Sequence, residues 1–197
     1  MASLDDPVAA LDRGELVVFP TESVYGLGAD ATSAGAVERL VAVRGREPGK
    51  PILVLASDLA MVSMVARDVP VLARRLAERL WPGALTIVLP VRDDVPAVLA
   101  AGTGTIGVRV PAHATARELV ARLGRPVTAP SANPPGKPPA ETIADARAYF
   151  GTNVSAYVDG GRCSGVPSTV VAVDGGAVRI LRAGGVDAAT IHRVAEE

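Results

Sequence analysis

The sequence predicts a mixed α/β domain with a twisted, mostly mixed or antiparallel sheet and flanking helices. Short apolar runs of strand length alternate with segments of helical periodicity along the chain. Some of these strands lie between helices and others lie in a hairpin pattern, so both parallel and antiparallel strand pairs are expected. The 197 residues, 49% of them hydrophobic, suffice for one large core, and we expect a single domain over 1–197.

In the first half of the chain, expected helices and strands alternate. A short amphipathic helix should end at Gly14, because glycine commonly closes a helix. Ser33 is a candidate N-cap and Gly45 a candidate terminator of a second helix, which would present Arg44 at its end. The other expected elements are the apolar strands 15–20, 51–57 and 84–90 and a strong helix over 70–80, stopped by "WPG".

In the second half, turn residues separate the expected elements. Residues 105–111 alternate like a strand, and a helix over 113–124 should end at Gly124. A hairpin over 168–184 should turn at "DGG", residues 174–176. The remaining segments are a short strand entering a Pro-rich loop within 126–139, a helix over 141–150 and a closing helix over 187–197.

Composition excludes several classes of protein. A formal net charge of −1 argues against coating nucleic acid by bulk electrostatics, although a local basic cleft stays open. Cys163 is the single cysteine, so no disulfide framework is expected, and without clustered Cys, His or carboxylates no protein-built metal site is expected. No apolar run approaches a membrane span and no signal segment is evident, so we expect a cytoplasmic protein that binds no membrane.

The stretch "RGREPGKP", residues 44–51, contains glycines, a Gly-Lys pair and further cations, as phosphate-binding loops do. A Walker A loop places a glycine five residues before the second glycine and a Ser or Thr after the lysine. Here Gly45 and Gly49 are one residue too close, and Pro51 offers neither a hydroxyl nor a backbone N–H. What remains is a cationic turn, either a solvated surface loop or a site for an anion; its cations are Arg44, Arg46 and Lys50.

Polar residues at strand ends are further candidates for ligand contact. Thr21 and Ser23 stand beside glycines, where they could face a ligand or cap their own turn. Ser131 and Asn133 would share one face of an extended segment, in a ligand site or in a Pro-stiffened surface loop. Arg109 and Arg182 lie in apolar strand patterns, where a guanidinium needs an internal ion pair or a bound carboxylate or phosphate.

A nucleophilic cysteine is a weaker candidate. "GRCSG", residues 161–165, has the outline of a nucleophile elbow around Cys163. An elbow lies between a strand and a helix, whereas a strand is expected after this segment. We therefore do not expect a thiol nucleophile; of the two histidines, His113 should cap or orient its helix and His192 should lie on the surface.

Seven ordered motifs give the chain a resemblance to a known family. "FPTESVYGLGADA", the basic turn before "PILVL", "WPGALTIVLP", "TIGVRVPAH", "APSAN", "GVPSTVV" and "ILRAGG" resemble the YrdC-like threonylcarbamoyl-AMP synthases from about residue 7 onward. The resemblance implies a twisted mixed sheet around a basic cavity. It also implies synthesis of threonylcarbamoyl-AMP and pyrophosphate from L-threonine, bicarbonate and ATP, with Mg²⁺ carried by ATP, for threonylcarbamoyladenosine modification of tRNA. Implied partners are tRNA-modification proteins, with weak or no direct RNA binding.

The resemblance also assigns roles to residues. It implies that Arg44, Arg46 and Lys50 neutralise the triphosphate during catalysis. The nucleotide would further contact Thr105, Ser131, Asn133 and Arg182, and threonine would contact Thr21, Arg109, Ala129 and Ser168.

The chain departs from the family pattern at two positions. Arg44 stands where lysine is usual, and Pro139 where another hydroxyl is frequent. Two alternatives stay open on the same fold: a carbamoyl-transfer enzyme, and a double-stranded RNA-binding protein that uses the basic cavity without catalysis.

Overall fold

The strands form two sheets. The computed structural model describes residues 3–45 and 49–197. One sheet has the order β2-β1-β7, with β1 (Val17–Phe19) antiparallel to β2 (Gly26–Gly28) and parallel to β7 (Ala156–Tyr157). The six-stranded sheet has the order β6-β3-β5-β4-β8-β9; its strands are β3 (Val54–Leu55), β4 (Leu85–Pro90), β5 (Thr105–Arg109), β6 (Val127–Thr128), β8 (Thr169–Asp174) and β9 (Ala177–Arg182).

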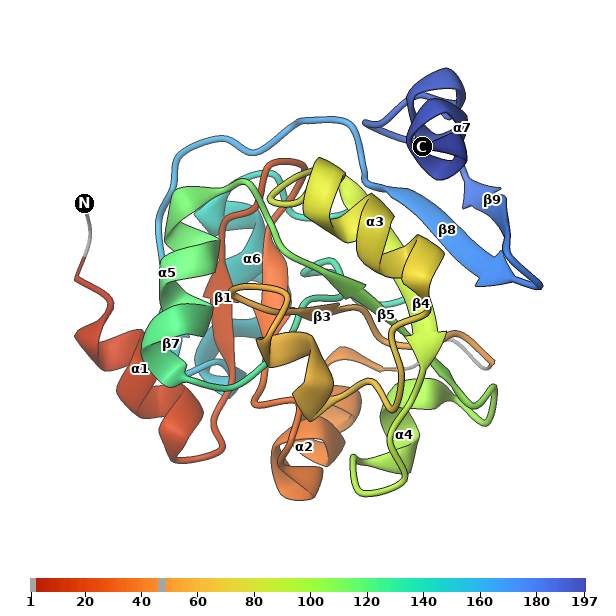
Figure 1. Cartoon of the computed structure of the whole chain (residues 1–197). Helices are drawn as coiled ribbons and strands as arrows, with labels where there is room; N and C mark the ends of the chain where they lie inside the picture. The colour runs from red at the N-terminus through yellow and green to blue at the C-terminus, as the bar shows by residue number, and fades with distance from the viewer. Residues whose placement is uncertain (1–2, 46–48) are drawn as a thin grey trace.

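Both sheets contain parallel and antiparallel pairs, which confirms the mixed α/β class. β3 runs parallel to β5, and β4 parallel to β8, whereas β3–β6, β4–β5 and β8–β9 are antiparallel. The expectation of one sheet was wrong. The irregular chain after β7 crosses from the small sheet to β8 of the large one, over the top of the view in Figure 1.

Helices cover the sheets, and all but α4 were expected from the sequence. They are α1 (Asp5–Asp12), α2 (Ala34–Arg44), α3 (Val71–Leu80), α4 (Ala97–Ala100), α5 (Ala114–Leu123), α6 (Ile143–Phe150) and α7 (Ala188–Glu196), with short 3₁₀ turns at Met61–Met64 and Gly151–Asn153. Figure 1 shows α1 beside α5 at one end of the molecule and α7 beside β9 at the other. None of the helices in the described part of the chain is long and apolar enough to cross a bilayer.

Local residues fix the ends of these elements. The Ser33 side chain accepts from the N–H of Ala36 at the start of α2, and Gly45, with φ of 81°, ends that helix. Gly124 ends α5 with φ of 70°. The β8–β9 hairpin turns at Gly175 and Gly176, both with positive φ, as a two-residue turn requires. These predicted boundaries are confirmed.

Strand β1 is buried on both faces, and this explains its continuous apolar run. Val18 lies in a core cluster with Leu27, Val37 and Leu40, beneath α2. Val17 and Phe19 lie in a second cluster; their partners there include Leu11 of α1, Leu119 of α5 and Val127 of β6. The small sheet therefore stands between two packed layers.

The two sheets meet where β2 approaches β6. Isolated bridges join Asp30 to Val127 and Gly26 to Ser131, in antiparallel fashion. A Cβ on Gly28 would lie 2.9 Å from Phe19 Cε1 and 3.0 Å from Val127 Cγ1, so glycine is needed for this close approach. The junction brings the loop after β1 and the loop after β6 to one place.

Candidate functional site

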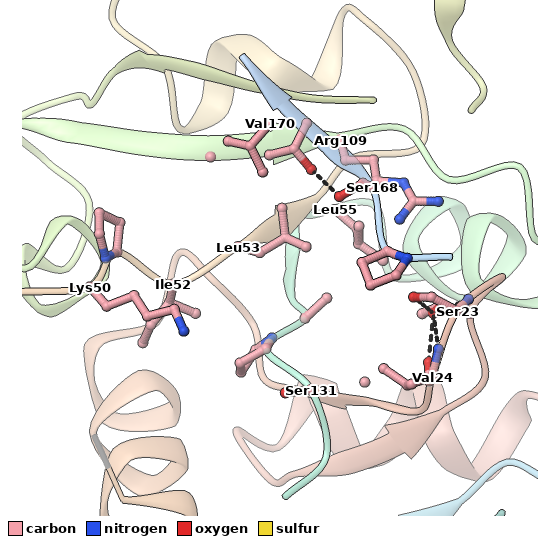
Figure 2. Close-up of a pocket in the computed structure, with 18 of the residues that line it drawn as sticks. Ser23, Val24, Lys50, Ile52, Leu53, Leu55, Arg109, Ser131, Ser168 and Val170 are labelled. Atoms are coloured by element: carbon pink, nitrogen blue, oxygen red, sulfur yellow. Dashed lines mark hydrogen bonds between the residues drawn. The ribbon is translucent and has the colours of Figure 1, made fainter. Parts of the chain in front are cut away.

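A cavity of about 610 Å³ opens between the two sheets. Its volume is typical of small-molecule sites. It is lined by the loop after β1, the end of α2, residues 50–55 and the loop after β6, together with strands β4, β5, β8 and β9. Figure 2 shows Lys50 on one side of the cavity and Arg109 with Ser168 on the other, with Leu53 between them.

The lining is cationic, as the resemblance implies. Among described residues it contains four cationic side chains and one carboxylate, which are Arg44, Lys50, Arg109, Arg182 and Glu22. The predicted site residues Thr21, Thr105, Ala129, Ser131 and Ser168 also line the cavity. Arg46 lies outside the described residues. An arrangement of this charge suits a polyanionic ligand.

Arg44 joins two of the predicted motifs. Because α2 ends at Gly45, Arg44 projects from the last turn of the helix into the lining. Its Nε donates to the carbonyl of Ser131 at 3.0 Å. Ser131 is held in turn by hydrogen bonds of its neighbours, from Leu27 N to Pro130 O and from Ala132 N to Tyr25 O. The cationic turn and the loop after β6 thus form one wall.

Asn133 lies outside this wall. The chain bends at 132–133 instead of staying extended, so the expected shared face with Ser131 was wrong. The Asn133 amide nitrogen donates to the carbonyls of Pro134 and Lys137, and its buried Oδ1 has no partner among the described residues. Asn133 is not among the lining residues of the described chain. Its contact with a nucleotide stays a prediction.

Arg109 lies at the opposite wall and is paired within the protein. It is only 4% exposed, and its Nη2 lies 2.7 Å from Glu22 Oε2, an ion-pair contact without the alignment of a hydrogen bond. Its Nε donates to the carbonyl of Gly83 at 2.8 Å. Burial lowers the pKa of the Arg109 guanidinium, and Glu22 opposes that shift. The internal ion pair left open by the sequence is therefore present, and the same guanidinium faces the cavity.

Glu22 is a site residue to which the sequence analysis gave no role. Its Oε1 accepts from the backbone N–H of His113 at the start of α5, at 2.9 Å. Its side chain keeps 25% exposure and lines the cavity. The signal for it was indirect: a strand arginine in an apolar pattern needs a carboxylate, and Glu22 stands in a loop of hydroxyl residues.

Most hydroxyls of the lining bond within the protein. Thr21 Oγ1 donates to the carbonyl of Val24 at 2.6 Å, so the turn caps its own backbone. Ser168 Oγ lies 2.8 Å from Thr86 Oγ1, a residue the sequence analysis did not select. Thr105 Oγ1 lies 3.0 Å from Thr103 Oγ1. The hydroxyl groups are thereby oriented. Those of Ser168 and Thr105 keep capacity for a further bond, whereas Thr21 Oγ1 also accepts from the N–H groups of Ser23 and Val24.

Arg182, at the end of β9, and Ala129, just after β6, complete the lining. Arg182 lies exposed on edge strand β9, so its guanidinium is not enclosed by the apolar residues of the strand. Its Nη2 donates to the carbonyl of Ser168 at 2.7 Å. The N–H of Ala129 donates to the carbonyl of Leu53 at 2.8 Å, so sheet pairing already uses this group.

The weaker catalytic candidates lie apart from the lining. Cys163 is buried in irregular chain before β8, and burial raises the pKa of its thiol. His113 occupies the N-cap position of α5, but the idea that its side chain caps the helix was wrong, since it makes no cap hydrogen bond. Burial lowers the pKa of His113. His192 is exposed, as expected.

The fold and the site define a class of protein: a mixed α/β domain with a cationic ligand cavity between two sheets. Similarity to known proteins gives the family. The family model Sua5_yciO_yrdC, described as "Telomere recombination", matches residues 9–184. The chain belongs to the Sua5/YciO/YrdC family.

Relatives of the chain include proteins named threonylcarbamoyl-AMP synthase. One from Pyrococcus abyssi is 39% identical over 94% of this chain and 55% of its own length. One from Halorhodospira halophila is 35% identical over 88% of this chain and 91% of its own length. The crystal structure of P. abyssi Sua5 complexed with L-threonine superposes with a TM-score of 0.89 at 37% identity, over 95% of this chain and 56% of that one. The chain spans just over half the length of the Pyrococcus protein.

Proposed function

We propose that this chain is an L-threonylcarbamoyladenylate synthase, a nucleotidyltransferase that converts L-threonine, bicarbonate and ATP to threonylcarbamoyl-AMP and pyrophosphate. The observation that carries the proposal is a cavity with cations on two walls. Lys50 lies on one side and Arg109 on the other (Figure 2), and Arg44 joins the lining through its bond to Ser131. A triphosphate and an amino acid carboxylate are two anions that need such separate walls. The names of the relatives agree with this assignment.

The reaction needs positioned charge more than a protein nucleophile. The threonine amine and bicarbonate first form a carbamate with loss of water, and a carbamate oxygen then attacks the α-phosphorus of ATP and displaces pyrophosphate. Both reactants are anionic, so neutralisation and alignment lower the barrier. Arg44, Arg46 and Lys50 supply positive charge to the triphosphate together with Mg²⁺ that arrives on ATP. Thr105, Ser131, Asn133 and Arg182 hold other nucleotide oxygens.

Threonine occupies the opposite wall in this proposal. Arg109 binds its carboxylate, and Thr21, Ser168 and the chain at Ala129 surround its side chain. All four of these residues border the same cavity. The reaction belongs in the cytoplasm, where the labile product passes to tRNA-modification proteins, and direct RNA binding is weak or absent.

The test is to incubate purified protein with ATP, Mg²⁺, bicarbonate and labelled threonine, and to detect threonylcarbamoyl-AMP directly. Pyrophosphate release should require both threonine and bicarbonate, because the attacking carbamate needs both. Serine should react about 10- to 200-fold less well, since it lacks one methyl contact. Equal pyrophosphate release without threonine would contradict the proposal.

A further inference from the structure

Glu22 is fixed in place from several sides. Its loop connects β1 to β2, and the N–H of Gly165 donates to the carbonyl of Ser23 at 3.0 Å. A Cβ on Gly165 would lie 2.1 Å from the Glu22 carbonyl oxygen, so the 160–168 segment packs directly on this loop. One carboxylate oxygen accepts from the backbone N–H of His113, the N-cap residue of α5, and the other contacts Arg109. The Glu22 side chain is therefore oriented before any ligand binds.

The hydrogen-bonding capacity of the Glu22–Arg109 pair is only partly used by contacts within the protein. Arg109 has five N–H donors; Nε and Nη2 contact Gly83 and Glu22, and no described residue accepts from Nη1. Glu22 keeps 25% side-chain exposure although its Oε2 is buried against Arg109, and both residues border the cavity. A cationic donor and an anionic acceptor thus stand side by side at one wall.

The charges of this pair are complementary to those of an amino acid zwitterion: the guanidinium matches the carboxylate of the ligand, and the carboxylate matches its ammonium group. In a free α-amino acid the carboxylate and the ammonium group are both bonded to the same carbon atom, Cα. Where the carboxylate meets Arg109, the ammonium lies within a few ångströms of it and needs an acceptor. Glu22 is the sole carboxylate among the described lining residues.

We propose that Glu22 binds the α-ammonium group of the amino acid substrate, while Arg109 binds its carboxylate. This inference rests on the proposed function and adds a specificity residue to it. Glu22 then orients the nitrogen that becomes the carbamate nitrogen, and it selects amino acids over hydroxy acids of the same shape. A charged hydrogen bond contributes more than a neutral one, so this selection is substantial.

The test compares two ligands on two proteins by calorimetric binding, without bicarbonate so that no turnover occurs. The ligands are L-threonine and its 2-hydroxy analogue, in which a hydroxyl replaces the amino group. Glu22→Gln keeps the size of the side chain and removes its charge. It should weaken threonine binding about 10- to 100-fold and change binding of the hydroxy analogue less than about threefold.

The matched control is Glu15→Gln. Glu15 is also paired with an arginine, Arg13 at 2.8 Å, and keeps 27% side-chain exposure, close to the 25% of Glu22. Glu15 lies outside the lining within the described chain, so the control should leave both affinities unchanged.

Other outcomes separate the inference from the proposed function. Equal weakening of both ligands by Glu22→Gln would show that Glu22 acts only by holding Arg109, and would overturn the inference alone. Undetectable threonine binding by the wild-type protein would overturn the proposed function as well. If Glu22→Gln fails to fold, the wild-type protein still decides: threonine must bind at least about tenfold more tightly than its hydroxy analogue, and equal affinities contradict the inference.

Discussion

Arg44 at the end of α2 donates through Nε to the carbonyl of Ser131, 87 residues later in the chain, at 3.0 Å. The bond links the cationic turn to the loop after β6, and it uses the side of the guanidinium that a lysine lacks. Arg44 therefore has two roles at this wall: it carries charge into the cavity and it fixes the position of Ser131.

Substitution of Arg44 separates these two roles. Arg44→Lys keeps the charge and should retain threonine-dependent pyrophosphate release within about tenfold, equivalent to about 1.4 kcal/mol. Arg44→Ala removes the charge as well and should cost about 2–4 kcal/mol in the barrier. Steady-state rates of both variants give the two numbers. Arg39→Ala removes a cation from an exposed position on the same helix and serves as control; equal effects at positions 39 and 44 would contradict a role at the triphosphate.

Loss of Arg109 should destabilise the fold. Arg109→Ala leaves the partly buried Glu22 carboxylate without its cation, and we expect the free energy of unfolding to fall by about 2–3 kcal/mol. The comparison is Arg92→Ala, which breaks an exposed pair with Asp94 at 2.7 Å and should change stability by less than about 1 kcal/mol. Urea denaturation measures both. Similar small losses would show that the Glu22–Arg109 pair contributes nothing net.

Gly28 tests the junction of the two sheets. Gly28→Ala places a methyl group against Phe19 and Val127, at 2.9 and 3.0 Å, and should destabilise the protein by about 1–3 kcal/mol. Gly35→Ala, in α2, meets no atom within 4 Å and should stabilise by about 0.5–1 kcal/mol. The sign of the change in urea midpoint distinguishes them. A neutral Gly28→Ala would mean that Phe19 moves aside freely.

Tyr25 should make stability fall at alkaline pH. Its hydroxyl donates to the carbonyl of Gly161 at 2.6 Å, and burial raises its pKa from 10.0 to about 12. Between these values the unfolded chain loses the phenolic proton while the folded chain keeps it, so the free energy of unfolding declines as pH rises from 10 to 12. Below pH 10 the stabilisation is fully present.

Urea titrations of wild type and Tyr25→Phe across this range test the expectation. The stability difference between the two proteins should shrink as pH approaches 12, since phenylalanine has no proton to lose. Tyr149→Phe, which removes an exposed hydroxyl bonded to the carbonyl of Pro138, is the control and should keep the wild-type dependence. A constant difference for Tyr25→Phe would contradict the assignment.

Local signals in the sequence determined most element boundaries. Ser33 and Gly45 delimit α2, Gly124 ends α5, and two glycines turn the β8–β9 hairpin, because capping and positive φ depend on residues only a few positions apart. The apolar run at β1 likewise predicted a buried strand, and the ordered motifs predicted the family. The role of each site residue and the single-domain organisation stay predictions.

Only the tertiary structure decided how distant segments pair. β2, with the sequence Gly-Leu-Gly, has no strand periodicity; it forms because it pairs with β1 and packs against Phe19. The partner of β1 on its other side, β7, comes more than a hundred residues later. The position of Arg109 in an apolar strand predicted that it has an anionic partner, but the sequence did not show which of several carboxylates that partner is. Glu22 fills that role because the β1–β2 loop is pinned against the 160–168 segment, and this contact depends on both sheets being formed.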